Sequence, residues 1–450
     1  MTTAQSTVGV DAARARAISP ATAGRLALWG FVLVNLAVVE YVFFTTGFAR
    51  NPLILVGKFI GLHLALLMML QLILIARVPW LDRRIGMDRL TSWHRWTGFA
   101  LFWAVVLHPT FILLGYSQLE HMSVWQEITR LAVMFNVLTG MIAATIVVVA
   151  VAFSVRFARR RLSYETWHTI HVFLYAAVTL ALIHQALETT TLRSNPWIGA
   201  YWWTLWTLVL LALLVGRVVV PLRRNARHRL RVAAVVPESD NVVSVYVTGR
   251  DLDRLRAQAG QFFLWRFLGH NRWWQVNPFS LSAAPDGERL RLTAKASGST
   301  SAGLRDVPVG TRVFAEGPYG AFTTLHRSRE ATLLIAGGVG VTPVRALLEV
   351  LTGPTVVLYR VQRPTDAVLR AELEALAAER GATIHVLAGR TGDGNRPFDP
   401  DNLRALVPDV ADRDVYVCGP PAMTSAVLRS LRELGVPRRQ VHAERFSLAG

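Results

Sequence analysis

Cysteine is almost absent from the sequence: Cys418 is the single one in 450 residues. This excludes an intrachain disulfide and any metal site built from several cysteines of one chain. Charged residues are also scarce, at 17% against 52% hydrophobic residues. Acidic residues are the rarer sign, with 30 Asp and Glu against 48 Lys and Arg, giving a formal net charge of +18. The arginines lie beside apolar runs, which favours a membrane-topology signal over a nucleic-acid partner.

The first residues of the chain, 1–23, lack an apolar stretch and contain Arg14 and Arg16. We therefore expect no cleavable signal peptide and predict a disordered cytoplasmic tail. Beyond this tail, six apolar runs are each about long enough to span roughly 30 Å of hydrocarbon. They lie near residues 26–46, 54–76, 96–116, 131–155, 166–187 and 198–220.

Arginine is concentrated in alternate connections between these runs. The segments 77–95, 156–161 and 217–231 are rich in arginine, whereas the other connections carry few. By the positive-inside rule, both termini and all that follows the last run are cytoplasmic, and the protein lies in the cell membrane. The third and fifth runs then cross the lipid bilayer in the same direction.

The second half of the chain has a different pattern. Short alternating segments at 241–249, 261–267, 289–295 and 311–317 are typical of antiparallel strands. From about residue 330, strand and helix patterns alternate, as in an α/β domain. We predict a multi-domain membrane protein: a six-helix transmembrane bundle at 24–220, an antiparallel β-barrel at 227–328 and an α/β doubly wound domain at 330–450.

Four histidines lie on the third and fifth runs. His94 and His108 are 14 residues apart, and His171 and His184 are 13 apart, so each separation is roughly 20 Å along a helix. On parallel helices, His94 can face His171 and His108 can face His184, and each pair can ligate a haem iron. Fourteen residues return to nearly the same helix face, but thirteen miss it by roughly 140°. A tilt, a bulge or the haem position must absorb this difference, and His168 fits no better.

The alternative for the four histidines is a structural role, with each ring bonded to core neighbours. Polar groups at membrane depth are costly and usually functional, which favours the haem interpretation. For His63 we expect a structural role, and for His168 a position next to a ligand. Glu40 and Lys58 are expected to pair with each other; the alternative is that Lys58 meets a haem propionate.

Two motifs in the strand-rich part suit a flavin. Residues 277–280, Asn-Pro-Phe-Ser, end a strand, where Phe279 can lie against an isoalloxazine ring and Ser280 can reach its N5. A turn of small residues just before a helix suits a pyrophosphate, because helix N-termini attract anions. That turn contains Lys295, Gly298, Thr300 and Ser301. Alternatively, the first motif is a plain turn and the second a plain helix cap.

Three further motifs suit a nicotinamide dinucleotide. Residues 336–343, Ala-Gly-Gly-Val-Gly-Val-Thr-Pro, follow an apolar strand and open a helix, without the G-x-G-x-x-G fingerprint. Arg360 and Arg363 follow the next strand, where an adenosine 2′-phosphate would lie, or are solvated surface residues. Residues 418–423, Cys-Gly-Pro-Pro-Ala-Met, end another strand and are a plausible nicotinamide site.

The order of these motifs resembles the ferredoxin–NADP reductase superfamily. Together with the histidine-bearing bundle, residues 26–446 resemble the ferric reductase and NADPH oxidase family. The resemblance implies FAD, two haem b groups and NADPH as cofactors, with NADH as an alternative. It also implies the roles of individual residues. The implied positions are Asn277, Pro278, Phe279, Ser280, Lys295, Gly298, Thr300 and Ser301 for the flavin; Gly337, Gly338, Gly340, Thr342, Pro343, Arg360, Arg363, Cys418, Gly419 and Pro420 for the dinucleotide; Ser280, Cys418 and the flavin-covering Phe446 for catalysis; and His94, His108, His171 and His184 for haem iron.

The sequence departs from the family pattern at two positions. Asn277 stands where the family often has His, which should tune flavin contacts. Ile112 stands where superoxide-forming oxidases often have another His, which weakens dioxygen as the acceptor. We expect electrons to pass from cytoplasmic NAD(P)H to an outer acceptor, a ferric chelate or dioxygen, with a quinone or a periplasmic protein also open. The rival hypotheses are a membrane-anchored ferredoxin reductase-like flavoprotein and a redox sensor or haem subunit of a larger complex.

Overall fold

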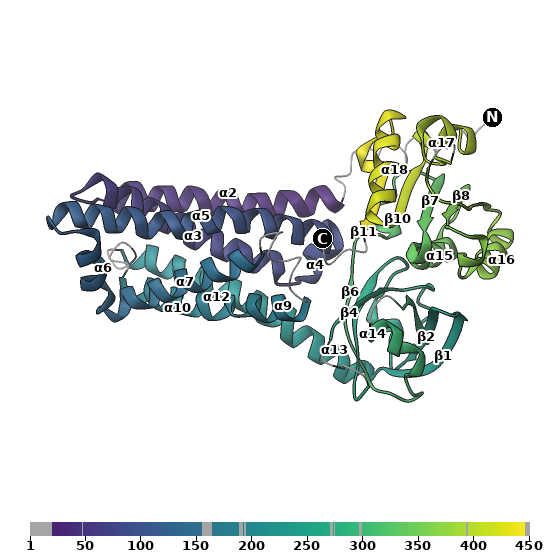
Figure 1. Cartoon of the computed structure of the whole chain (residues 1–450), viewed down its shortest axis with the longest axis horizontal. Helices are drawn as coiled ribbons and strands as arrows, with labels where there is room; N and C mark the ends of the chain where they lie inside the picture. Colours follow the sequence, from purple (N-terminus) through teal and green to yellow (C-terminus); the bar gives the residue numbers. More distant parts are fainter. Residues whose placement is uncertain are drawn as a thin grey trace, which may run out of the picture.

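The computed structural model describes residues 20–46, 48–154, 164–188, 192, 195–270, 273, 275–296, 299–392 and 395–445. These residues form an elongated helical bundle and, at one end of it, two lobes that contain the strands (Figure 1). The bundle precedes both lobes in the sequence. One end of the bundle is attached to the lobes, and the other end, near α6 (Val124–Ala132), is far from them.

The bundle contains six helices long and apolar enough to cross a membrane, as the sequence predicts. Two of them begin with Asn-Pro, in which the asparagine caps the helix and the proline occupies its first turn. Asn51 accepts from the Leu53 amide at 2.8 Å, and Asn195 from the Trp197 amide at 2.9 Å. The spans are α2 (Pro20–Thr46), α3 (Pro52–Ile75), α5 (Met87–Leu119), α7 (Phe135–Ser154), α9 with α10 (Tyr164–Val172 and Leu174–Glu188) and α12 (Pro196–Leu214).

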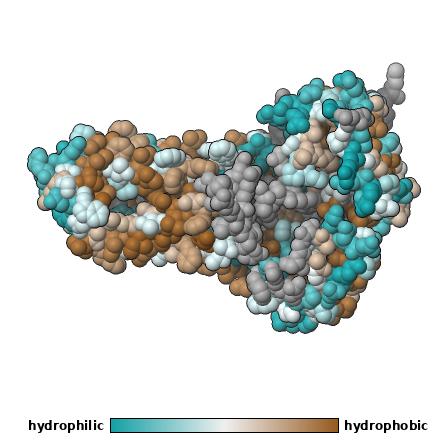
Figure 2. All heavy atoms as spheres, in the orientation of Figure 1, coloured by the Kyte–Doolittle hydropathy of each residue, from teal (hydrophilic) through white to brown (hydrophobic). Residues whose placement is uncertain are grey.

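The outer surface of the bundle is apolar. Figure 2 shows hydrophobic residues along the visible side of the rod and hydrophilic residues at its far end and over the lobes. Large side chains such as Leu33, Phe44 and Trp103 are more than half exposed there. Such continuous apolar exposure fits a lipid environment, and the chain is a multi-pass membrane protein.

The last span continues beyond the predicted end of the bundle at residue 220. A π-helical turn (Val215–Val219) leads into α13 (Val220–His228), which ends where Arg229 takes a left-handed conformation. Asn225 of α13 bonds both backbone groups of Ala315, at 2.8 and 2.9 Å. This polar last helix is therefore fixed by the first lobe and carries the chain directly into it.

The first lobe, here called the β lobe, contains two three-stranded antiparallel sheets, with strand orders β1-β2-β5 and β4-β3-β6. Isolated bridges, such as Leu281 with Leu292, connect the described parts of the two sheets. The described strands form two sheets and no closed barrel, so the antiparallel β-barrel stays a prediction. The strands are β1 (Arg231–Ser239), β2 (Val242–Thr248), β3 (Phe262–Phe267), β4 (Asn277–Ser280), β5 (Arg289–Lys295) and β6 (Val313–Tyr319).

The second lobe, here called the α/β lobe, has a five-stranded parallel sheet in the order β11-β10-β7-β8-β9. Buried residues of α15 and α16 pack on one face of this sheet and those of α17 and α18 on the other. The elements are β7 (Thr332–Gly337), α15 (Val341–Val350), β8 (Thr355–Arg360), α16 (Arg370–Arg380), β9 (Thr383–Leu387), α17 (Pro400–Leu406), β10 (Asp414–Gly419), α18 (Pro421–Glu433) and β11 (Val441–Arg445).

Candidate functional site: paired histidines beside a two-lobed module

The histidines nearer the lobes, His94 of α5 and His171 of α9, are called the proximal pair. Their ring centroids are 6.1 Å apart, with an angle of 75° between the ring planes. The Nδ1 atoms of both rings are buried without a hydrogen-bond partner among the described residues. The structure thus brings together two imidazoles that the sequence separates by 77 residues, and leaves buried nitrogens unsatisfied.

The histidines farther from the lobes on the same two spans, His108 and His184, are called the distal pair. Nδ1 of His108 lies 2.8 Å from the Gly57 carbonyl, and Nδ1 of His184 lies 2.9 Å from the Asn136 carbonyl. Because a carbonyl only accepts, each Nδ1 carries the proton and each Nε2 keeps its lone pair. A metal-ligating histidine typically has this arrangement, since the bond from its second nitrogen fixes the ring.

The order of the pairs shows the direction of the helices. His94 faces His171, and both α5 and the α9–α10 span run from the lobe end of the bundle toward its far end (Figure 1). The later histidine on α5 therefore matches the later one on α10, so the two spans are parallel. The awkward 13-residue spacing coincides with a helix break at Phe173, where i to i+3 bonds replace regular helical ones. This tighter turn rotates the end of the span and absorbs part of the predicted angular mismatch.

Small residues make room for the distal pair. A Cβ atom at Gly61 of α3 would lie 2.8 Å from Cε1 of His108, and one at Gly140 of α7 would lie 2.9 Å from Nδ1 of His184. Both rings thus lie against bare helix backbone. The sequence analysis missed these glycines, although Gly57 and Gly61 form the G-x-x-x-G spacing typical of closely packed membrane helices.

The expected pairing of Glu40 with Lys58 is wrong. Glu40 lies 3.1 Å from Nε2 of His63, whose Nδ1 lies 2.8 Å from the Phe59 carbonyl. Lys58 donates instead to the Phe48 carbonyl at 3.2 Å. Side chains on neighbouring helices meet according to helix rotation, which the sequence positions alone do not determine. The partners of His63 agree with the structural role expected for it.

The candidate flavin motif lies on β4. Ser280 is buried, and its Oγ has no hydrogen-bond partner among the described residues. Phe279 is half-buried against the core of the β lobe, and its carbonyl accepts from Nε1 of Trp265 at 3.1 Å. Asn277 donates weakly, at 3.3 Å, to the Gln275 carbonyl, and Pro278 is exposed. An unsatisfied buried hydroxyl on this strand is a site where a bound molecule can accept or donate a hydrogen bond.

The predicted pyrophosphate turn is described in part. Lys295 is exposed at the end of β5, and Ser301 lies in the short helix α14 (Ser299–Ala302). Gly298 and the side chain of Thr300 lie outside the described residues, as does Phe446.

Tyr319 of β6 lies across the sheet from Ser280, because both residues pair with Phe262 of β3. Burial raises the pKa of Tyr319. Its hydroxyl therefore stays protonated.

The glycine loop after β7 meets the loop after β10. A Cβ at Gly340 would lie 2.2 Å from the Cys418 carbonyl, and one at Gly419 would lie 2.4 Å from Cε of Met423. Gly337 is similarly close to Met423. Gly338 differs, with a φ of +54° and open space around its Cβ position. Three glycines therefore allow the two loops to pack, and Gly338 leaves its backbone approachable.

These loops lie at the carboxyl ends of β7 and β10, neighbouring strands whose following helices cover opposite faces of the sheet. Ligands of α/β proteins bind at such switch points. Thr342 is buried, with its hydroxyl 3.0 Å from the Val339 carbonyl, and Pro343 lies in the first turn of α15. Pro420 precedes α18, whereas the Cys418 side chain is fully buried in the core. The structure brings these two motifs together.

Two arginines, the last residue of β8 and one shortly after it, have partners within the α/β lobe. Arg360 donates to the carbonyls of Leu387 and Ala388 at 3.2 and 3.1 Å, and one of its nitrogens is buried without a partner. Arg363 is largely exposed and pairs with Asp366 at 2.9 Å. Both lie at the same end of the sheet as the glycine loop. Arg363 can approach a phosphate only by leaving Asp366, whereas Arg360 has one nitrogen without a partner among the described residues.

The connector between the second and third spans docks onto the β lobe. Arg77 forms an ion pair with Glu316, which also pairs with Arg266 of the lobe. The carboxylate of Asp82, in α4 (Pro79–Ile85), accepts from the Gly320 amide at 3.1 Å. The arginine-rich connector thus has structural contacts in addition to its value as a topology signal. These contacts fix the lobes at the end of the bundle that holds the proximal pair.

Comparisons with known proteins divide the chain in the same way. Residues 60–182 match the family of ferric reductase like transmembrane components. Residues 227–323 match a FAD-binding domain, and residues 334–429 match an oxidoreductase NAD-binding domain. The transmembrane match covers His94, His108 and His171 and ends two residues before His184.

Curated relatives match part of the chain. Ferredoxin–NADP reductase B of Sorangium cellulosum is 32% identical over 187 residues, which cover 37% of this chain and 77% of the relative. A flavohemoprotein of Xylella fastidiosa is 29% identical over 233 residues, covering 49% and 58%. The ferredoxin reductase component of a 3-ketosteroid-9-alpha-monooxygenase from Mycolicibacterium smegmatis is 30% identical, covering 48% and 65%. The chain thus spans less than two thirds of the length of the latter two relatives.

Solved structures also match part of the chain. The ferredoxin reductase in carbazole 1,9a-dioxygenase is 24% identical, with a TM-score of 0.41 over 49% of this chain and 69% of that chain. A ferredoxin NADP+ reductase from Neisseria gonorrhoeae is 16% identical, with a TM-score of 0.42 over 48% and 97%. With the three family matches in sequence order, the chain belongs to the ferric reductase and NADPH oxidase type of membrane oxidoreductase, a transmembrane ferric reductase-like domain fused to a ferredoxin–NADP reductase-like FAD and NAD module.

Proposed function

We propose that this oxidoreductase moves electrons from cytoplasmic NAD(P)H through FAD and two b-type haems to an acceptor on the outer side of the cell membrane. The observation that carries this proposal is the contact of His94 with His171 on two parallel spans next to the docked lobes, with His108 and His184 farther along the same spans. When bound, FAD accepts a hydride and the haems carry single electrons, while the protein supplies position and electrostatics. The arginine-rich connections support the cytoplasmic placement of the lobes.

The four histidines would be the axial ligands of the two haems. His94 and His171 would hold the proximal haem, and His108 and His184 the distal one. The carbonyls of Gly57 and Asn136 orient the distal rings and leave Nε2 available. Each pair would hold its iron between α5 and the fifth span.

The lobes would hold the other two cofactors. Ser280 and the rest of the β4 motif would bind the flavin ring together with Phe446, and Lys295, Gly298, Thr300 and Ser301 would bind its pyrophosphate. The open Gly338 and the two arginines, Arg360 and Arg363, would bind NAD(P)H, which Cys418 and Pro420 would help to orient. In this proposal the β lobe is a FAD-domain barrel within 227–328, and the α/β lobe is a doubly wound domain within 330–450, preceded by the bundle at 24–220.

A ferric chelate is favoured over dioxygen as the acceptor. Ile112, one turn beyond His108, packs against Gly57, where a Cβ would lie 2.7 Å from its Cδ1. This apolar side chain offers no hydrogen bond or proton to a bound dioxygen.

A visible spectrum of the detergent-purified protein, recorded anaerobically before and after addition of NADPH, tests the proposal. Low-spin haem b bands that are reduced by NADPH support it. A preparation that contains FAD and reduces it, but holds no haem after expression with added haem precursor, would overturn it. That result would support the alternative, a membrane-anchored flavoprotein serving another carrier, which the similarity to a ferredoxin–NADP reductase favours.

Substitution of one distal ligand separates the two haems. His108→Ala should lose the distal haem while NADPH still reduces the flavin and the proximal haem. His63→Gln is the matched control, because His63 is a half-buried histidine on the adjacent span with protein partners at both nitrogens. Retention of both haems in His108→Ala would show that the assignment of ligands is wrong.

A further inference from the structure

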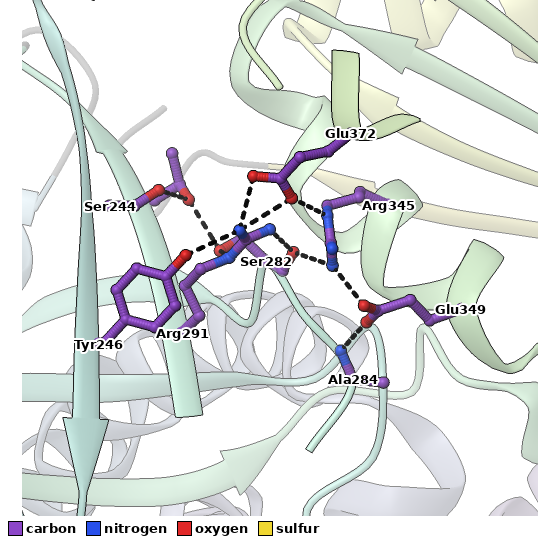
Figure 3. A network of polar contacts seen from close by, with 9 residues as sticks. Ser244, Tyr246, Ser282, Ala284, Arg291, Arg345, Glu349 and Glu372 are labelled. Atoms are coloured by element: carbon purple, nitrogen blue, oxygen red, sulfur yellow. Dashed lines mark hydrogen bonds and ion pairs between the residues drawn. The ribbon is translucent and has the colours of Figure 1, made fainter. Parts of the chain in front are cut away.

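A polar network joins the β lobe to the α/β lobe (Figure 3). Arg291 of β5 contacts both carboxylate oxygens of Glu372 in α16, at 3.0 and 2.9 Å. Nε of Arg345 in α15 contacts the same carboxylate at 2.6 Å. One carboxylate of the α/β lobe is therefore shared by a guanidinium from each lobe.

The network closes through the segment that follows β4. The Ser282 carbonyl accepts from Arg291 at 2.7 Å and from Arg345 at 3.1 Å. Arg345 also pairs with Glu349 at 2.8 Å, and Glu349 accepts from the amide of Ala284. The two lobes are thus connected by a closed ring of charged contacts (Figure 3).

The charges in this ring are matched; its two arginines are buried, and its two carboxylates are partly exposed. Arg291 is 4% exposed and Arg345 is 8% exposed, so each guanidinium has lost most of its hydration. Two carboxylates, Glu349 and Glu372, compensate the two positive charges. Removal of the Glu372 charge would leave buried Arg291 without its ion-pair partner and Arg345 with Glu349 alone, which costs more than loss of a surface pair. The ring therefore favours one arrangement of the lobes.

The two sides of the ring lie close to the two candidate cofactor motifs. Ser282 is two residues beyond Ser280, the candidate flavin contact on β4. Arg345 is three residues beyond Thr342, about one helical turn from the glycine loop that opens α15. A shift at the ring would therefore change the distance between the flavin motif and the dinucleotide motif.

We propose that Arg291, Arg345 and Glu372 are positioning residues that hold the nicotinamide site in register with the flavin site. The inference rests on the proposed function, in which a hydride passes with its two electrons from C4 of NAD(P)H to N5 of the flavin. That transfer oxidises NAD(P)H and reduces FAD, and a misplacement of about 1 Å can slow such a step by about 100-fold. The three residues touch neither reacting atom and act through the elements they fix.

Glu372→Gln is the test variant, because it removes the charge and keeps the shape of the side chain. Glu374→Gln is the matched control, since Glu374 lies on the same helix in an exposed pair with Arg370 at 2.7 Å. In anaerobic stopped-flow mixing with NADPH, Glu372→Gln should lower the limiting rate of flavin reduction by about 10- to 100-fold. Its FAD content and its half-saturating NADPH concentration should stay within about twofold of the wild-type values. Glu374→Gln should match the wild type throughout.

Amide hydrogen exchange of the full chain without added NADPH gives a readout that does not depend on activity. Glu372→Gln should increase exchange in residues 282–284 and in the first turns of α16, and Glu349→Gln should do the same at Ala284. If a variant loses FAD or fails to fold, this second carboxylate variant provides the kinetic test instead. Flavin reduction at the wild-type rate in both variants would overturn the inference. Wild-type protein whose flavin NADPH does not reduce would instead overturn the proposed function.

Discussion

The rings of His94 and His171 lie with their centroids 6.1 Å apart, close to the separation that one shared metal ion requires. A first-row metal binds an imidazole nitrogen at about 2 Å, so two rings on opposite sides of one ion have centroids roughly 6 Å apart. The Nδ1 atoms of both rings are buried and have no hydrogen-bond partner among the described residues. The proximal pair therefore has the spacing of a ligand pair before any iron is added.

Gly61→Ala should selectively weaken the distal haem site. The new methyl group would lie 2.8 Å from Cε1 of His108, so the ring would have to move. Ligand displacement should reduce the haem content by about half, measured against FAD as the pyridine haemochrome. Gly30→Ala is the control, because it adds the same methyl group to a membrane helix with no atom within 4 Å. Equal haem content in both variants would contradict this role for Gly61.

The larger elements could be predicted from the sequence, because they depend on hydrophobic length and period. Six spans and the alternation of strands and helices after residue 330 follow from those patterns. Other features depend on tertiary contacts. No glycine or proline near Phe173 predicts the helix break there. The helix α13 extends beyond residue 220 because Asn225 forms hydrogen bonds with the backbone of Ala315. Glu40 meets His63 and not Lys58 for the same reason.

The site residues divide in the same way. Histidine identity and spacing predicted the ligand candidates, and motif order predicted the candidate flavin and dinucleotide segments. The sequence could not show that Gly337, Gly340 and Gly419 separate crowded loops while Gly338 faces open space, because backbone proximity decides these roles. The ring around Glu372 was also missed, since its members lie on β5, α15, α16 and the segment after β4.

Ser280→Ala should separate function from stability. Ser280 Oγ is buried without a partner, so its removal should leave the free energy of unfolding unchanged or slightly higher. Flavin reduction by NADPH should nevertheless slow, by about 10-fold or more, because the hydroxyl is the proposed contact of the flavin. Thermal unfolding and stopped-flow absorbance measure the two effects.

Ser282→Ala provides the opposite case. The Ser282 hydroxyl accepts from Nε of Arg291 at 3.1 Å and bonds Thr293 at 2.7 Å. Its loss leaves buried partners unsatisfied and should lower stability by about 1–3 kcal/mol. A Ser280→Ala protein that is as destabilised as Ser282→Ala would contradict the assignment of Ser280.

His326 should make the docking of the lobes sensitive to acid. Burial lowers the pKa of His326 below 6.5, against the raising effect of its bond to the Arg83 carbonyl, and His442, Arg89 and Arg25 lower it further. The unfolded chain therefore binds more protons as the pH falls below 6.5, and the free energy of unfolding falls until the folded pKa is passed.

The measurement is the thermal midpoint in detergent at about pH 7.5 and about pH 5.5. The wild-type thermal midpoint should be lower at the lower pH. The midpoint of His326→Gln should decrease less, because glutamine can still donate to the Arg83 carbonyl but does not titrate. Identical declines would exclude His326 as the cause.

The ratio of haem to FAD in the purified wild-type protein, after expression with sufficient haem precursor, tests the central claim most directly. Two ligand pairs on one pair of parallel spans predict two haems b for each FAD, both low-spin because each iron has two imidazole ligands. Pyridine haemochrome and flavin absorbance give the ratio, and electron paramagnetic resonance gives the spin state. A ratio of two with low-spin signals is the predicted result; a ratio of one or zero, or high-spin iron throughout, would contradict the account.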